Sequence, residues 1–278
     1  MYLSAERVSL VNQTITETFE QTCISWQAIP HWDTGDPGQS RVRDDVVDTP
    51  GFVEVLLYHE DFQVTLVQTS APTPDSLIAE VILATTKLAR TVDEIVLLWL
   101  GAVAQGNYPI EFLAKSANEL LAALIDARAK VEDEGYRAPS CLITNTQGLK
   151  YLSALDFGYP ITEALLDSAH VNSLHRTSLY DFDAGEVDET GNPTGVDKPA
   201  TIMVMLGRRQ LIPHGGAPDA SPGEEPVDLA VSVCPSLEVI GETADSKLEL
   251  SIRTRFALRV KDPKPLVVLY GMPVAVAP

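Results

Sequence analysis

The chain has 278 residues, 45% of them hydrophobic, which is enough to bury a core in one large domain or two smaller ones. Its formal net charge of −19 argues against a dedicated nucleic-acid binder and against docking on anionic membranes, because both need clustered Lys and Arg. No secretory signal opens the sequence, and we expect a cytoplasmic protein. The cysteines are odd in number and widely spaced, which predicts buried, reduced thiols at Cys23, Cys141 and Cys234.

The first third of the chain predicts a helix, a loop and a hairpin. Ser4 can cap a helix that runs to about Cys23. One face of this helix carries an apolar stripe: Val8, Val11, Ile15, Phe19 and Trp26. Residues 31–45 are rich in Gly, Pro and charge and predict a loop. The segment FVEVLLYHEDFQVTLVQ, residues 52–68, predicts a hairpin that turns at residues 59–61, since polar residues favour turns.

Helices dominate the middle of the chain. Asp75 or Ser76 is expected to cap a helix that stops near Gly101, and a second helix is expected from Ser116 to Glu134. The first of these contains the longest apolar run, residues 95–104, which is only about half of a membrane span and predicts a buried helix.

Strands become frequent in the second half. SCLITN, residues 140–145, predicts a short buried strand, and residues 146–155 and 161–169 predict helices separated by DFGYP. TIMVML, residues 201–206, predicts a strand between two acidic loops, residues 181–199 and 213–226. The order of helix, hairpin, helices and then strands predicts an α+β fold.

The strongest single pattern is LELSIRTRFALRV, residues 248–260. Apolar and polar residues alternate over thirteen positions, which predicts a half-buried strand far longer than the usual five or six residues. Residues 227–241 are expected to form its hairpin partner. Its outer face carries arginines, whose guanidinium groups suit bidentate bonds to carboxylates. The alternative is a strand with ordinary solvated arginines.

Motifs of catalysis and metal binding are missing from the sequence. It has no glycine-rich phosphate loop, GxSxG, HExxH or cysteine-based zinc pattern. His170 and His175 lie five apart, which misses the helical metal spacing, and residues 181–189 fit a solvated acidic loop better than a calcium loop. We therefore predict no catalytic residue, metal or cofactor. A soluble α+β enzyme that uses His170, Asp181 or Asp183 with a divalent ion stays open as an alternative.

Two segments resemble encapsulin shell proteins. RAPSCLITNTQGLKYLSALDFGYPITEALL, residues 137–166, is similar to the encapsulin succession of a strand ending in Asn, a helix, GYPI and another helix. Residues 227–271 are similar to the encapsulin C-terminus, in which a hairpin leads to a long strand with a TxxFxxRV cadence and a short apolar strand. No counterpart of the tryptophan that stacks flavin in some members is present, so the resemblance implies no cofactor.

The resemblance implies the phage major-capsid-like fold of the Hong Kong 97 type, with a P-domain, an E-loop and an A-domain. The implied segments are 1–35, the N-terminal helix and start of the P-domain; 36–72, the E-loop hairpin; 73–135, the P-domain with its spine helix; 136–226, the A-domain; 227–262, the long-strand hairpin of the P-domain; and 263–278, a return to the A-domain. The implied function is a shell protein that self-assembles into a closed icosahedral compartment around a cargo protein, bound through a short terminal docking peptide.

Three sites follow from the resemblance. A subunit interface is expected at Arg253, Arg255, Arg259, Val55, Leu57, Phe62 and Val64. A five-fold pore is expected at Asp156, Phe157, Gly158, Tyr159 and Pro160, where a ring of Asp156 carboxylates would favour cations. A cargo-peptide groove is expected at Val8, Val11, Ile15 and Phe19. The alternative to the interface is a hairpin docked on its own domain, and the alternative to the pore is a tight turn. The alternative to the groove is an apolar stripe that packs into the P-domain.

A phage major capsid protein that encloses DNA is the competing interpretation. Phage capsid proteins often carry a long N-terminal scaffolding segment, whereas the first helix here is expected from about residue 5, as in encapsulins. That position favours the compartment. Some phages encode the scaffold separately, so the capsid alternative stays open.

Overall fold

The structure is a computed structural model that describes residues 3–46, 49–113, 116–156, 158–181, 201–208, 225–243 and 245–272. The chain divides into two compact units. The first comprises Met1–Val96 with Val227–Val260, and the second comprises Leu97–Pro226 with Lys261–Pro278. Each unit is built around a sheet of its own.

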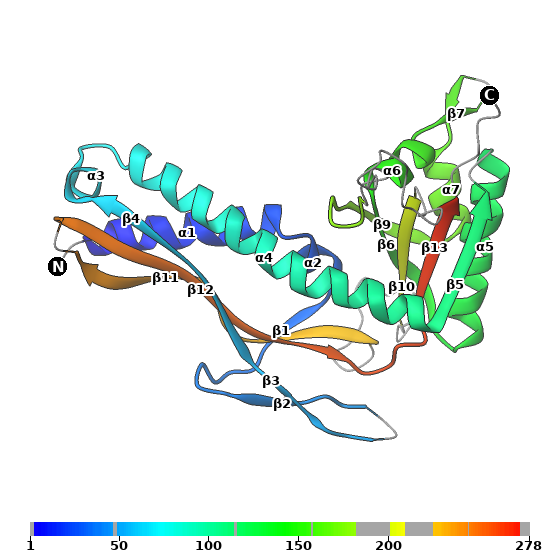
Figure 1. Cartoon of the computed structure of the whole chain (residues 1–278), viewed down its shortest axis with the longest axis horizontal. Helices are drawn as coiled ribbons and strands as arrows, with labels where there is room; N and C mark the ends of the chain where they lie inside the picture. The colour runs from blue at the N-terminus through cyan, green and yellow to red at the C-terminus, as the bar shows by residue number, and fades with distance from the viewer. Residues whose placement is uncertain are drawn as a thin grey trace, which may run out of the picture. The chain divides into compact units, whose positions relative to one another are not determined.

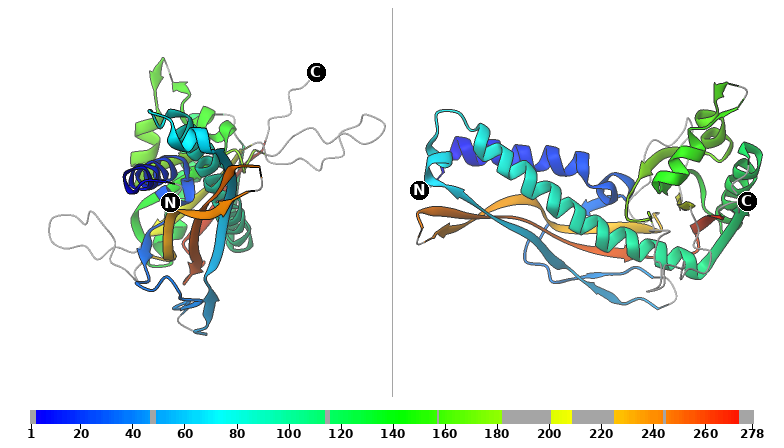
Figure 2. Two further views of the ribbon diagram at one scale, coloured as in Figure 1. Left: turned by 90° about the vertical axis from the view of Figure 1, so that its left-hand side faces the viewer. Right: turned by 45° about the horizontal axis from the view of Figure 1, so that its top comes forward.

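The sheet of the first unit has four strands in the order β1-β11-β12-β4. These strands are β1 (His31–Asp33), β11 (Val227–Glu242), β12 (Lys247–Val260) and β4 (Leu56–Thr65). Helix α1 (Ala5–Thr22) and the first part of α4 (Asp75–Asn107) lie over one face, called the inner face (Figure 1). The hairpin of β2 (Arg41–Arg43) and β3 (Phe52–Glu54) lies against the other, outer face (Figure 2). Short helices α2 (Ile24–Ala28) and α3 (Leu66–Ser70) complete the unit.

Strand β12 is the long strand that the alternating pattern predicts. Leu248, Leu250 and Ile252 are each 0% exposed on the inner face. β12 pairs with β11 on one side and β4 on the other, antiparallel in both cases. Thr254, which interrupts the apolar alternation, is also 0% exposed and donates its hydroxyl to the carbonyl of Val233 at 3.0 Å. This hydrogen bond satisfies the one polar group on the apolar face.

The prediction of a hairpin that turns at residues 59–61 is wrong. Strand β4 runs unbroken from Leu56 to Thr65 with these three residues at its middle, and it pairs with β12 from Thr65 opposite Lys247 to Leu56 opposite Phe256. This continuous ladder outweighs the turn preference of three polar residues. The hairpin in this part of the chain is instead β2–β3, in which Val42 lies opposite Val53.

Helix α1 forms as its sequence predicts. The Ser4 hydroxyl accepts a hydrogen bond from the amide of Arg7 at 3.3 Å and caps the helix. Val11, Ile15 and Phe19 are buried, and the Asn12 side chain accepts the amide of Leu237 on β11 at 2.9 Å. The apolar stripe and this polar contact hold α1 on the inner face of the sheet.

The second unit has a mixed sheet of five strands in the order β5-β13-β10-β6-β9. Its strands are β5 (Tyr108–Leu113), β13 (Leu266–Met272), β10 (Thr201–Arg208), β6 (Arg137–Thr144) and β9 (Val171–Arg176). Helices α5 (Ala117–Asp133), α6 (Thr146–Leu152) and α7 (Thr162–Ser168) share one buried cluster with this sheet. Its members include Leu124, Leu142, Met205 and Leu269. Strands β5 and β9 have no counterpart in the elements predicted above.

Helix α4 continues to Asn107, past its predicted end near Gly101. A side-chain carbon added at Gly101 would lie 3.4 Å from the ring of Tyr180, whose hydroxyl donates to the carbonyl of Leu97 at 2.8 Å. The glycine therefore allows an aromatic ring to approach the helix and does not end it. Among the described residues, no helix has both the length and the apolar character needed to cross a bilayer.

The cysteine prediction is confirmed at two positions and wrong at the third. Cys23 and Cys141 are buried, but Cys234 is exposed on β11. The register of β11 against β12 shifts between Val233 and Ser236. An irregularity of this kind interrupts the alternation of side chains between the two faces and explains the outward position of Cys234.

Candidate functional site

The outer face of the first sheet carries a small hollow at its centre, called here the outer-face hollow. The register places Arg253 of β12 opposite His59 of β4, and Ser251 opposite both Asp61 of β4 and Glu238 of β11. With Leu57 and Ile240 these side chains line a volume of about 210 Å³. His59 and Asp61, which the sequence predicts to lie at a turn, are therefore part of a surface formed by β4, β12 and β11.

Charged groups of both signs meet in the outer-face hollow. The Arg253 Nη1 atom lies 2.7 Å from the Glu238 Oε2 atom, with both side chains about 40% exposed. The His59 and Asp61 side chains form a longer contact of 3.8 Å. Exposed pairs of this kind contribute about 0–1 kcal/mol, so they do little for the fold. The Arg253 Nε atom is buried without a hydrogen-bond partner among the described residues.

Two apolar side chains border the hollow. Leu57 is 50% exposed and Ile240 is 52% exposed, on strands that flank β12. Exposed apolar groups beside incompletely bonded polar groups are typical of a protein-binding surface. The hollow thus combines exposed apolar side chains with charged groups of both signs.

The other residues predicted for the interface are placed differently. Val55 and Val64 are buried, at 3% and 1% exposure, and Phe62 is half-buried on the inner face. Arg255 donates to the carbonyls of Pro37 at 3.1 Å and Val55 at 3.4 Å, within its own unit. Arg259 is 5% exposed and is bonded to residues of its own chain. Leu57 and Arg253 are the two that line the outer-face hollow.

The residues predicted for a pore lie on a tight hairpin of the second unit. Strand β7 (Leu155–Asp156) pairs with β8 (Tyr159–Pro160), and Asp156 lies opposite Tyr159 (Figure 1). Gly158 has φ = 85°, a conformation that glycine adopts readily. Tyr159 is 75% exposed. Phe157 and the side chain of Asp156 lie outside the described part of the chain.

The groove predicted on α1 is not accessible at three of its four residues. Val11, Ile15 and Phe19 are each 0% exposed because they pack in the first unit's own core, and Val8 is half-buried. A docking peptide could contact only Val8 among the four without displacing the helix. The apolar stripe that predicted a groove therefore forms part of the core of the first unit.

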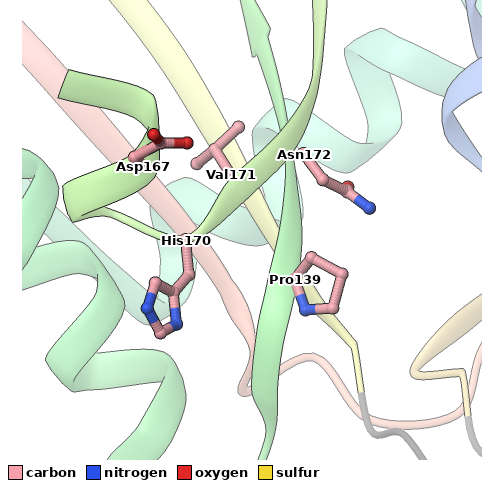
Figure 3. Close-up of a pocket in the computed structure, with 5 residues that line it drawn as sticks. All are labelled: Pro139, Asp167, His170, Val171 and Asn172. Carbon is pink, nitrogen blue, oxygen red and sulfur yellow. The ribbon is translucent and has the colours of Figure 1, made fainter. Parts of the chain in front are cut away.

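The second unit has a shallow hollow of about 480 Å³ beside β9. Pro139, Asp167, His170, Val171 and Asn172 line it, and the Asp167 carboxylate and His170 ring do not point toward one another (Figure 3). Within the described ranges, no three His, Cys, Asp or Glu side chains are grouped as metal ligands would be. Asp183, part of the enzyme alternative, lies outside those ranges.

Asp181, the other carboxylate of that alternative, stabilises local structure. Its carboxylate accepts hydrogen bonds from the amide and hydroxyl of Thr146, at 2.9 and 2.7 Å, and from Arg176 at 3.1 Å. Burial alone raises the pKa of Asp181, but these bonds outweigh it and lower the pKa below its usual value of 3.8. Asp181 is thus an ionised anchor for the start of α6.

Comparison with known proteins places the fold. No protein-family model and no curated protein matches the sequence. The virus-like particle from Pyrococcus furiosus is similar in structure, with a TM-score of 0.69 and 14% identity over 95% of this chain and 100% of that chain. A phage-related protein from Bordetella bronchiseptica RB50 has a TM-score of 0.63 and 8% identity over 94% and 96%.

A protein of Microbacterium phage Oxtober96 gives the same result, with a TM-score of 0.56 and 14% identity over 91% of each chain. In all three cases the similarity covers nearly the whole of both chains, so it includes the elements of both units. The α+β prediction and the implied fold are confirmed. This chain has the phage major-capsid-like fold of the Hong Kong 97 type.

Proposed function

We propose that this protein is a structural shell protein whose copies assemble into a closed, hollow icosahedral particle that encloses a cargo protein. The observation that carries the proposal is the full-length similarity to the Pyrococcus furiosus virus-like particle, which leaves none of that chain unmatched. In this assignment the first unit corresponds to the P-domain with the E-loop hairpin, and the second to the A-domain. The protein acts by assembling and needs no catalytic group.

The outer-face hollow supports a role in contacts between copies. Leu57 and Ile240 expose apolar surface there, and Phe52 at the end of the β2–β3 hairpin is 73% exposed. Apolar groups on a sheet and a projecting aromatic side chain favour burial against a partner, since each buried side chain contributes about 1.5–3 kcal/mol. We assign the subunit interface to this surface, with Arg253 and Leu57 at its centre.

We assign the pore to the β7–β8 hairpin and cargo docking to helix α1. Five copies of the β7–β8 hairpin around an axis would bring exposed Tyr159 side chains together and could admit small molecules or ions. Cargo docking on α1 would involve Val8, since its three partners in the stripe lie in the core.

A phage major capsid protein that encloses DNA is the second candidate. It is favoured by the similarity to the phage-related protein of Bordetella bronchiseptica and to the protein of Microbacterium phage Oxtober96. The net charge of −19 favours the protein cargo, because a wall with an excess of carboxylates repels the phosphates of packaged DNA.

Particle mass and contents test these proposals. Light scattering after gel filtration and negative-stain electron microscopy of the recombinant protein should show hollow particles of megadalton mass. A chain of 30.1 kDa that stays a monomer or dimer at high concentration would contradict assembly. The contents of particles isolated from the native source then separate the candidates. An enclosed second protein supports a compartment, and enclosed genomic DNA that is protected from nuclease supports a capsid.

A further inference from the structure

Arg259 connects four parts of the first unit. Its Nε and Nη2 atoms form a bidentate pair with the Asp228 carboxylate on β11, at 2.6 and 2.5 Å. Its Nη1 atom donates to the carbonyl of Arg43 on β2 at 2.9 Å and to the Asp45 carboxylate at 2.7 Å. The guanidinium carbon also lies 4.9 Å from the ring centroid of Trp32 on β1.

These contacts leave Arg259 unsuited to a contact with another copy. Its side chain is 6% exposed and that of Asp228 is 4% exposed, so the pair is shielded from solvent. All three guanidinium nitrogens already donate within the chain. Burial opposes the charge, but the bonds that Arg259 donates to the Asp228 and Asp45 carboxylates outweigh it and raise the pKa of Arg259. The residue is therefore charged at neutral pH, as arginines in proteins are.

The contacts of Arg259 join the β2–β3 hairpin to the sheet. Arg43 is the last residue of β2, and Asp45 is the second residue of the connection to β3, with a left-handed φ of 55°. Aspartate tolerates this conformation better than most residues, and the bond to Arg259 holds it there. The Asp44 carboxylate closes the same connection by accepting the amides of Gly51 at 2.7 Å and Val46 at 3.2 Å.

A small apolar cluster also holds the hairpin on the outer face of the sheet. Val42 and Val55 are both 3% exposed and pack on Ala230 and Ala257 of the sheet. The small side chains of this alanine pair leave room for the hairpin to approach the outer face. By contrast Phe52, beside this connection, projects into solvent. Phe52 lies opposite Arg43 in the β2–β3 ladder, so Arg259 holds the same end of the hairpin from which this aromatic side chain projects.

From these contacts we propose that Arg259 is a latch that docks the β2–β3 hairpin on its own sheet, so that the hairpin is oriented before the protomer meets a second copy. The inference deepens the proposed function, on which its role in assembly rests. A bonded arginine is suited to this task because a buried bidentate pair specifies one geometry even where desolvation offsets its energy. Assembly then needs no ordering of the hairpin, which lowers the entropic cost of each contact between copies.

Asp45→Asn tests the latch without disturbing the buried pair. Asparagine keeps the shape and tolerates the left-handed backbone, but it removes the negative charge that Asp45 presents to Arg259 at 2.7 Å and to Arg43 at 3.6 Å. The Asp228 pair stays intact. Glu54→Gln is the matched control, since it removes the Arg41–Glu54 pair of the same hairpin, in which both side chains are about 65% exposed. Hydrogen exchange of the hairpin amides, residues 41–43 and 52–55, is compared with that of β11 and β12.

We expect Asp45→Asn to speed exchange in the hairpin roughly tenfold, because a charge-assisted bond is lost, while β11 and β12 exchange as in the wild type. Glu54→Gln should change neither. Unchanged exchange in the Asp45→Asn hairpin, or equal loosening by both variants, would overturn the latch. If the hairpin loosens in a protein that never forms particles, the latch stands and the proposed function fails. If particles form, Asp45→Asn should lower their yield while the protomer stays folded.

Discussion

At the scale of single residues, Asp93 organises the turn between the first two helices. Its carboxylate is 5% exposed and accepts the Ser25 amide and hydroxyl, both at 2.7 Å, the Ile24 amide at 3.0 Å and the Cys23 thiol at 3.4 Å. Helix α2 has no side-chain cap of its own, so Asp93 supplies the acceptor from α4. Burial, and then the Asp93 charge, raise the pKa of Cys23, which keeps that thiol protonated as a donor.

Replacing this carboxylate should be costly. Asp93→Ala leaves several buried donors unbonded and should lower the free energy of unfolding by about 3 kcal/mol. The control is Glu94→Ala, which removes a half-exposed pair with Arg90 and should cost at most about 1 kcal/mol. Urea titration followed by circular dichroism measures both. Equal losses in the two variants would show that Asp93 is no more than a surface charge.

At the scale of elements, the close approach of β10 and α5 depends on Gly207. A side-chain carbon at this position would lie 2.3 Å from Val131 Cγ1 and 3.1 Å from Pro265 Cβ. The Gly207 amide also donates to the Pro265 carbonyl at 2.9 Å. The Pro265 ring and the buried Val131 side chain therefore leave too little space for a methyl group.

Gly207→Ala should therefore lower the free energy of unfolding by about 1–3 kcal/mol through overpacking. Gly106→Ala is the matched control in the same unit, because nothing lies within 4 Å of its added carbon and it belongs to α4. That control should be neutral or stabilising by up to about 1 kcal/mol, from helix propensity. Thermal unfolding of both variants gives the comparison, and a Gly207→Ala midpoint at or above that of Gly106→Ala would contradict the packing argument.

At the scale of the whole molecule, the proposed function requires an acidic chain to bind copies of itself. With 39 acidic and 20 basic residues, copies repel at long range, and contacts form only where basic and apolar groups are exposed together. The outer-face hollow is such a place, since Arg253 has an unbonded Nε atom and lies between exposed Leu57 and Ile240.

Charge reversal on this surface should separate folding from assembly. Arg253→Glu puts an acidic group beside Asp61 and Glu238, so we expect a folded protomer that forms no particles. Arg90→Glu makes the same charge change at an exposed helix position and should assemble as the wild type does. Circular dichroism reports folding, and gel filtration with electron microscopy reports assembly. Normal particles from the Arg253→Glu variant would show that this surface is not part of the interface.

The sequence by itself determined the elements whose signals are local. Alternation over residues 248–260 was sufficient for β12, and the caps at Ser4 and Ser116 were sufficient for the starts of α1 and α5. The resemblance of two segments to encapsulins was sufficient to predict the fold, because their order of strands and helices is the one found in the capsid-like fold.

Only the tertiary structure decided what depends on partners distant in sequence. Residues 59–61 are polar enough for a turn, and pairing with β12 almost two hundred positions later makes them the middle of a strand. The alternation of β12 placed Arg253 and Arg259 on one outer face, yet one borders an open hollow and the other is buried under the β2–β3 hairpin. The physical reason is that periodicity fixes the side of a strand on which a residue lies, whereas burial depends on which other segment covers that side.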